Sequence, residues 1–212
     1  YDASVGRWWS VDPLANKFSN TTPYNSFLSN PLNIVDIQGD SSWPVTRQWD
    51  AQDFEGYSDF VDSEIKNMKT NAEEFDCADL ATTLLIRYSS ENNLEVSFTS
   101  VDGKAISSSS DIASSPEEFE KIVKQTTNAK SIMNDMEKIM GIPKPGYMTN
   151  NGFHVNIVTS PDPNTIYGSE VPSTSGSLPA RVPKDSSVSP SSTFLRWDVI
   201  SEAARSAYYE KK

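Results

Sequence analysis

Apolar residues recur at helical spacing in the first half of the chain. In residues 58–71 the apolar positions Phe60, Val61, Ile65 and Met68 fall on one helical face, and Ser58 is the expected N-cap. A second helix is predicted to start at Cys77, behind Asp76 as its cap. Its apolar side chains share one face with the cysteine. The pattern therefore predicts two consecutive amphipathic helices.

The clearest helical pattern begins behind Ser115, with a proline in the first turn and two glutamates that favour the positive helix end. An apolar stripe continues to Met140, and Gly141 and Pro143 end it. Its methionines, Met133, Met136 and Met140, are interpreted as core residues.

Alternating patterns predict strands between and after these helices. Residues 94–107 form an expected hairpin that turns at Asp102 and Gly103, and residues 152–160 form an expected strand around His154. Residues 160–193 are rich in Ser, Pro and Gly and are predicted to be a long loop or partly disordered. A last strand over 193–200 and a terminal helix over 201–212 complete an α+β pattern.

Residues 1–40 differ in composition from the rest of the chain. They are dense in aromatic residues, asparagine and proline, which is typical of short extended pieces separated by turns. Residues 41–57 are predicted to be a linker that passes into the first helix, so residues 58–212 form the expected main domain. The chain opens on Tyr1 rather than Met, which we interpret as a fragment of something longer.

Two motifs in the first 40 residues resemble a known family. The run YDASVGRWWSVDPLA at 1–15 is similar to the YDxxxGRFxSxDPL signature of the Rhs/YD-repeat core, and TPYNSFLSNPLNIVDIQGD at 22–40 is similar to its closing segment. Ile37 stands where the family usually has proline, which leaves self-cleavage here open. The resemblance implies a tail that closes a β-shell, followed by a C-terminal toxin secreted into competing bacteria. An Rhs shell and a cognate immunity protein are then the expected partners.

Charge and cysteine content narrow the classes of function. The net charge of −11 argues against a nucleic-acid partner and is compatible with a basic one, or simply with a soluble surface. A single cysteine excludes an internal disulfide, and no apolar run is long enough to span a membrane. One His and one Cys far apart make no metal-ligand cluster, so no cofactor is expected.

Cys77 and His154 are the candidate catalytic pair. A thiol at the first position of a helix meets unpaired N–H groups and the positive end of the dipole, which stabilise a thiolate. The two neighbouring aspartates, Asp76 and Asp79, oppose this. The alternative is that Cys77 is a small core residue, that His154 is a structural residue in a strand, and that Asp79 only caps the helix.

The order of a helix-start Cys followed by a strand His is the order of papain-fold enzymes. DCADLA at 76–81 resembles the DCSGL nucleophile segment of the NlpC family, and FHVNIV at 153–158 resembles its HVGIYI strand. Asn156 replaces a glycine of that strand. The resemblance implies an α+β, papain-like helix-then-antiparallel-sheet domain that hydrolyses amides in peptidoglycan stem peptides. The same apparatus could act on a protein.

A third residue would orient the imidazole by accepting its Nδ1–H. The candidates are Asn164, Glu170 and Asp198, and Asp198 is slightly favoured because its segment has strand character. Two alternatives to the hydrolase stay open. One is an ADP-ribosyltransferase that uses Arg87, the STSG run at 173–176 and Glu202. The other is a non-enzymatic binding tip of the Rhs shell.

Overall fold

Three helices begin at side chains that cap their first turns. In the computed structural model, which describes residues 41–162, 165–170, 180–189 and 191–201, these are α1 (Ala51–Thr70), α2 (Cys77–Glu91) and α3 (Pro116–Thr126). Their N-caps are Asp50, Asp76 and Ser115, and each cap side chain accepts a backbone N–H of the first turn. The predicted caps of α2 and α3 are confirmed. Residues 1–40 and 202–212 lie outside the described part of the chain, so the terminal helix expected over 201–212 is not described beyond Ser201.

The first helix starts earlier than the sequence pattern indicates. Ser58 is a buried residue inside α1, so its prediction as an N-cap was wrong. Asp50 caps the helix instead and forms a capping box with Asp53. The preceding segment also packs on the domain, because Trp43 is only 4% exposed and its Nε1 donates to Leu94 O at 2.8 Å. Residues 41–57 are therefore part of the folded unit and not a linker.

A buried carboxylate fixes this segment to the helices. Asp53 is 1% exposed and receives both terminal nitrogens of Arg47, at 2.6 and 2.8 Å, and the hydroxyl of Tyr88 at 3.0 Å. Burial alone would disfavour its ionised form, but the hydrogen bonds from Arg47, Asp50 N–H and Tyr88 outweigh it, so its pKa lies below the ordinary value. The network joins residues 47–50, α1 and α2.

The third helix is shorter than expected. It ends at Thr126, because Thr126 and Thr127 turn their hydroxyls back onto carbonyls of the preceding turn and Asn128 caps a new turn. A 3₁₀ turn, η3 (Ser131–Asp135), and strand β3 (Met136–Lys138) follow. The methionine stripe is consequently not a core face. Met136 is partly buried, whereas Met133 and Met140 are 40% and 99% exposed.

The predicted hairpin is confirmed. Strands β1 (Ser97–Thr99) and β2 (Ala105–Ser107) pair antiparallel, with Phe98 opposite Ile106. The turn uses Gly103 at φ +81°, a conformation that suits glycine. The hairpin is tied to the rest of the domain by Asp135, whose carboxylate accepts the N–H and hydroxyl of Thr99.

The second sheet has six antiparallel strands in the order β3-β8-β4-β5-β6-β7. Its further members are β4 (Met148–Asn150), β5 (Val155–Asp162), β6 (Thr165–Glu170), β7 (Lys184–Val188) and β8 (Leu195–Trp197). Two of these strands run through residues 160–193, where the sequence pattern indicates a loop. The expected last strand is three residues long, and helical residues replace it from Asp198.

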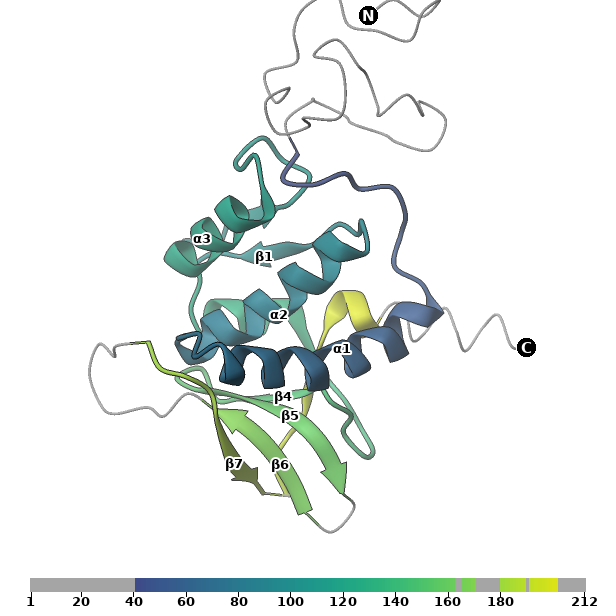
Figure 1. The fold of residues 1–212 in the computed structure, drawn as a ribbon, viewed down its shortest axis with the longest axis vertical. Coiled ribbons are helices and arrows are strands. Elements are labelled where there is room, and N and C mark those ends of the chain that lie inside the picture. Colours follow the sequence, from purple (N-terminus) through teal and green to yellow (C-terminus); the bar gives the residue numbers. More distant parts are fainter. Residues whose placement is uncertain (1–40, 163–164, 171–179, 190, 202–212) are drawn as a thin grey trace, which may run out of the picture.

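The helices cover one face of this sheet and bury the main core against it. Figure 1 shows α1 and α2 stacked next to strands β4–β7, with α3 and β1 farther from the sheet. Trp197 of β8 is the centre of the contact, because its Nε1 donates to the buried Tyr57 hydroxyl of α1 and its ring meets Phe98 edge-on. The α+β class is thus established, with antiparallel sheets.

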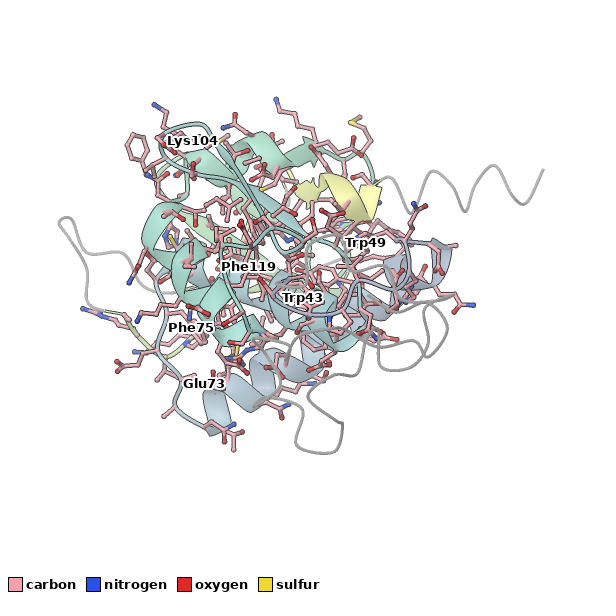
Figure 2. The ribbon with its side chains drawn as sticks, turned by 90° about the horizontal axis from the view of Figure 1, so that it is seen from above. Trp43, Trp49, Glu73, Phe75, Lys104 and Phe119 are labelled. Atoms are coloured by element: carbon pink, nitrogen blue, oxygen red, sulfur yellow. The ribbon has the colours of Figure 1, made fainter. Side chains whose placement is uncertain are left out.

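Aromatic side chains pack together in the part of the domain that lies farther from the six-stranded sheet. Figure 2 shows Trp43 next to Phe119 of α3, and the two rings meet edge-to-face at 5.5 Å between centroids. Phe119 also lies against Phe98 of the hairpin. Side chains from residue 43, β1 and α3 thus form one packed layer above α2, which holds that helix from the side opposite the sheet.

Candidate active site

The start of α2 is fixed from both sides. Asp76 Oδ1 accepts the N–H of Asp79 at 2.7 Å, which satisfies one free donor of the first turn. Immediately before it, Phe75 and Arg181 exchange two backbone hydrogen bonds of 3.0 and 2.9 Å. Phe75 is buried, and the Lys124 ammonium of α3 lies over its ring. Cys77 is thereby held at the first position of the helix.

The Cys77 thiol lies against the beginning of β5. The backbone N–H of Val155 faces the sulfur, as do the N–H groups of Ala78 and of Cys77 itself. Burial raises the pKa of the Cys77 thiol, the N–H groups act against this, and the charge of Asp76 adds to the increase. The net direction is upward. Cys77 is nevertheless partly exposed.

His154 lies in a tight turn just before β5 and not in the middle of a strand as expected. Asn151 Oδ1 accepts the N–H of Phe153 at 3.0 Å and of His154 at 2.8 Å, and the N–H of Asn151 donates to His154 O. Gly152 takes φ +85°, which a residue with a side chain rarely adopts. Asn150 Oδ1 accepts the Gly152 N–H at 2.8 Å. The turn fixes the backbone from which the imidazole projects.

These two local structures set the backbone of Val155, the residue after His154, beside Cys77. Val155, whose N–H meets the sulfur, is the residue directly after His154, and His154 is half-buried like Cys77. A thiol and several backbone N–H groups therefore lie next to the residue that carries the imidazole. This combination can activate a sulfur nucleophile and can hold a negative oxygen.

Asp198 is not brought to this place. Met148 of β4 pairs with both Ile157 and Leu195, and β5 and β8 run in the same direction because both are antiparallel to β4. His154 lies three residues before Ile157, and Asp198 lies three residues after Leu195. The two residues therefore adjoin opposite ends of strands that run in the same direction. This register does not favour Asp198 as the residue that orients His154, and the register was not visible in the sequence.

The other two candidates follow β5 directly in the chain. Asn164 lies between β5 and β6, outside the described residues. Glu170 is the last residue of β6, the strand that pairs with β5. Since Ile157 pairs with Ser169, the next step of the antiparallel register sets Glu170 opposite Asn156. That position is diagonal to His154, on the neighbouring strand.

Asn156 is a site residue whose role the sequence did not reveal. It lies on β5, two residues after His154. Its Oδ1 is buried without a hydrogen-bond partner among the described residues. An amide oxygen in this state is an available acceptor. The only sequence signal was the asparagine in place of the glycine of the similar strand.

Asp79 stands two residues from Cys77 and has an unusual carboxyl group. Its Oδ1 is buried and has no hydrogen-bond partner among the described side chains and backbone. Burial, with the negative charge of Asp76, raises the pKa of Asp79 to about 6. Its backbone N–H serves the helix cap. A carboxyl group that is partly protonated near neutral pH opposes the Cys77 thiolate less than a full charge would.

Arg87, the residue on which the ADP-ribosyltransferase alternative depends, is part of an ion-pair cluster. Its terminal nitrogens contact Glu64 and Glu73 at 2.6 Å each, and Nε lies 3.7 Å from Glu120. The guanidinium therefore joins α1, α2 and α3 and is engaged by protein carboxylates. The STSG run and Glu202 lie outside the described residues.

The described part of the chain was also searched for a metal site and for a membrane-spanning helix. Within it, no group of three or more His, Cys, Asp or Glu side chains is arranged to hold a metal ion. Among the same residues, no helix has the length and apolar character needed to cross a membrane.

Comparison of the whole chain with protein-family models, curated proteins and solved structures found no match.

Proposed function

We propose that this chain is a cysteine-dependent amide hydrolase with Cys77 as the nucleophile and His154 as the general base. The observation that carries the proposal is that the Val155 N–H faces the Cys77 sulfur, which sets the thiol beside the backbone that follows His154. A helix that begins at the cysteine and packs on the strand after the histidine is also the order of papain-like enzymes. We extend the proposal to that fold.

The first half of the reaction forms a thioester. His154 takes the Cys77 proton, and the thiolate attacks the carbonyl carbon of the substrate amide. The negative oxygen of the tetrahedral intermediate is held by backbone N–H groups at the start of α2. The C–N bond then breaks while His154 returns its proton to the nitrogen, so the amine leaves neutral and the acyl group stays on sulfur.

The second half restores the enzyme. His154 takes a proton from water, and the hydroxide oxygen attacks the thioester carbon. The C–S bond breaks, the sulfur regains the proton from His154, and the carboxylic acid is released. No oxidant, reductant or cofactor is needed in either half. Because the pKa of the Cys77 thiol is raised, only a small fraction of it would be ionised at neutral pH without a base, so the reaction requires His154.

We assign the orienting role to Glu170 in place of Asp198. Glu170 ends the strand next to β5, at the register position diagonal to His154. A carboxylate that accepts the Nδ1–H of the imidazole fixes the tautomer whose Nε2 can take a proton from sulfur. Asn156 lies two residues after His154, and its buried Oδ1 is a further acceptor in this region.

The biological setting of the proposal is a toxin delivered into a target bacterium. It is supported by the similarity of residues 1–40 to the closing segment of Rhs cores. The substrate we propose is the stem peptide of peptidoglycan, with an amide of a protein as the alternative. A basic immunity protein would complement the net charge of −11.

The experiment is expression in a bacterium with and without export to the periplasm. Wild type is compared with Cys77→Ala, His154→Ala and the matched control Asp198→Asn. The proposal predicts lysis on export only, lost in the first two variants and kept in the third, with cleaved stem peptides in the mass spectrum. Toxicity confined to the cytosol would indicate a protein substrate. NAD consumption that persists in Cys77→Ala would favour the ADP-ribosyltransferase, and harmlessness in both compartments would favour a binding tip.

A further inference from the structure

Phe153 is a large apolar side chain displayed beside the candidate nucleophile. It is 90% exposed, although burial of a phenylalanine side chain is worth about 2 kcal/mol. Two other described apolar residues are exposed to a similar degree, Met140 and Ile142, and both lie in the loop after β3. Single exposed apolar residues are common, so exposure alone does not give Phe153 a function.

The backbone under Phe153 is held firmly. Its N–H donates to Asn151 Oδ1, the preceding Gly152 N–H donates to Asn150 Oδ1, and Asn150 Nδ2 donates to Ala129 O at 2.7 Å. The same turn carries His154. A rigid backbone presents an apolar side chain without the entropy loss that a flexible loop would suffer on binding.

A second exposed apolar side chain flanks this turn. Met133 of η3 is 40% exposed, and a methyl group placed on Gly152 would lie 3.8 Å from its Sδ. Met133 and Phe153 come from segments twenty residues apart in the chain. They border the turn that leads into Val155, whose N–H meets the Cys77 sulfur. The apolar surface and the thiol thus belong to one neighbourhood.

We propose that Phe153, with Met133 beside it, is the specificity-determining residue of the hydrolase and binds an apolar side chain of the substrate next to the scissile amide. This inference rests on the proposed function. Phe153 is two residues before Val155, so their backbones lie within roughly 7 Å, and an extended substrate covers a similar distance in two residues of about 3.3 Å each. A side chain one or two positions from the reacting carbonyl therefore reaches Phe153 when that carbonyl reaches the sulfur.

The test uses two peptidyl chloromethyl ketones that carry leucine or asparagine, side chains of similar shape, at the two positions nearest the reactive carbonyl. Attack by Cys77 forms an S–C bond and releases chloride, and intact-mass spectrometry gives the rate. Iodoacetamide, which has no recognition element, measures thiol reactivity alone. Wild type is expected to react about tenfold or more faster with the leucine probe. Phe153→Ala should lose this preference, and Met140→Ala, which alters an equally exposed side chain, should keep it.

The outcomes separate the two proposals. Equal rates for the two probes in wild type, or a preference that survives in Phe153→Ala, would overturn the role of Phe153 and leave the hydrolase intact. Chloromethyl ketones that react no faster with wild type than with His154→Ala would overturn the hydrolase itself, and the specificity role with it. A thermal melt of each variant confirms that the exposed substitutions leave the fold unchanged.

Discussion

The backbone N–H of Val155 faces the sulfur of Cys77, so a helix start and a strand start meet at the thiol. The helix start is fixed by Asp76 and the strand start by the Asn151 turn. Nothing in the sequence of either segment indicates that the two are in contact. Their contact depends on the packing of α2 on β5, where Ala78 and Val155 enter the same core.

Glu170→Gln should reduce turnover while Asp198→Asn should not. The first change removes the carboxylate that we assign to the imidazole, and the loss of such a group lowers turnover by about a hundredfold or more. The second changes a residue that follows β8, at the opposite end of the sheet from His154. Turnover on purified peptidoglycan fragments, with iodoacetamide labelling of Cys77 as a check on the thiol, measures both. Equal losses would place Asp198 in the site and contradict the register argument.

Gly152→Ala should lower the reactivity of Cys77 with substrate-like probes. A left-handed conformation costs a residue with a side chain about 1–2 kcal/mol, so the turn that carries His154 would shift. Gly103→Ala is the matched control, since Gly103 has φ +81° in the β1–β2 turn with open space around it. Both variants should lose similar stability in urea. Unchanged labelling in Gly152→Ala would show that the turn does not position the imidazole.

Asp79→Asn should stabilise the fold, and the gain should depend on pH. The folded-state pKa of about 6 lies above the ordinary value of 3.8, so the folded protein holds this proton more tightly than the unfolded chain does. Stability is therefore lost in wild type as pH rises from about 4 through about 6, and the variant avoids that loss. The difference in unfolding free energy should be near zero below pH 4 and constant above pH 7.

Asp53→Asn is the control of opposite sign. The pKa of Asp53 is lowered by its hydrogen bonds, so its charge stabilises the fold above about pH 4 and the contribution disappears as pH falls further. The variant should be destabilised by about 3 kcal/mol at pH 7, since Arg47 loses a buried partner. Parallel pH profiles of the two variants would contradict both assignments.

Trp43→Ala should destabilise the domain by about 3–5 kcal/mol, the usual cost of removing a large buried side chain. The indole is packed against Phe119 and hydrogen-bonded to Leu94 O. Phe153→Ala is the control, because that ring is exposed. Urea unfolding measures both. A cost below 1 kcal/mol for Trp43→Ala would restore the interpretation of residues 41–57 as a linker.

Local chemistry determined which elements could be predicted. The cap Asp76, the Asp102–Gly103 turn and the strand after His154 each depend on a few adjacent residues, and their patterns were informative. The end of α3 was missed because the apolar spacing continues past Thr126, while the competing threonine and asparagine hydrogen bonds leave no trace in that spacing.

The register of the strands could not be predicted from the sequence. Strand β7 is a sheet edge with mostly exposed polar residues, so its alternation is faint and the segment resembled a loop. Asp198 and Glu170 both adjoin strands, and only the pairing of Met148 with Ile157 and Leu195 shows which end of the sheet each occupies. The pair Cys77 and His154 could be proposed from chain order, but its third member could not.

The most direct test of the central claim is the pH dependence of Cys77 alkylation by iodoacetamide in wild type and in His154→Ala. Burial and Asp76 raise the pKa of an isolated Cys77 thiol, so a thiolate at neutral pH requires the imidazolium beside it. We predict that the variant needs a pH at least one unit higher for the same rate, while Asp198→Asn follows wild type. Superimposable profiles for wild type and His154→Ala would show that the imidazole does not act on the sulfur and would contradict the account.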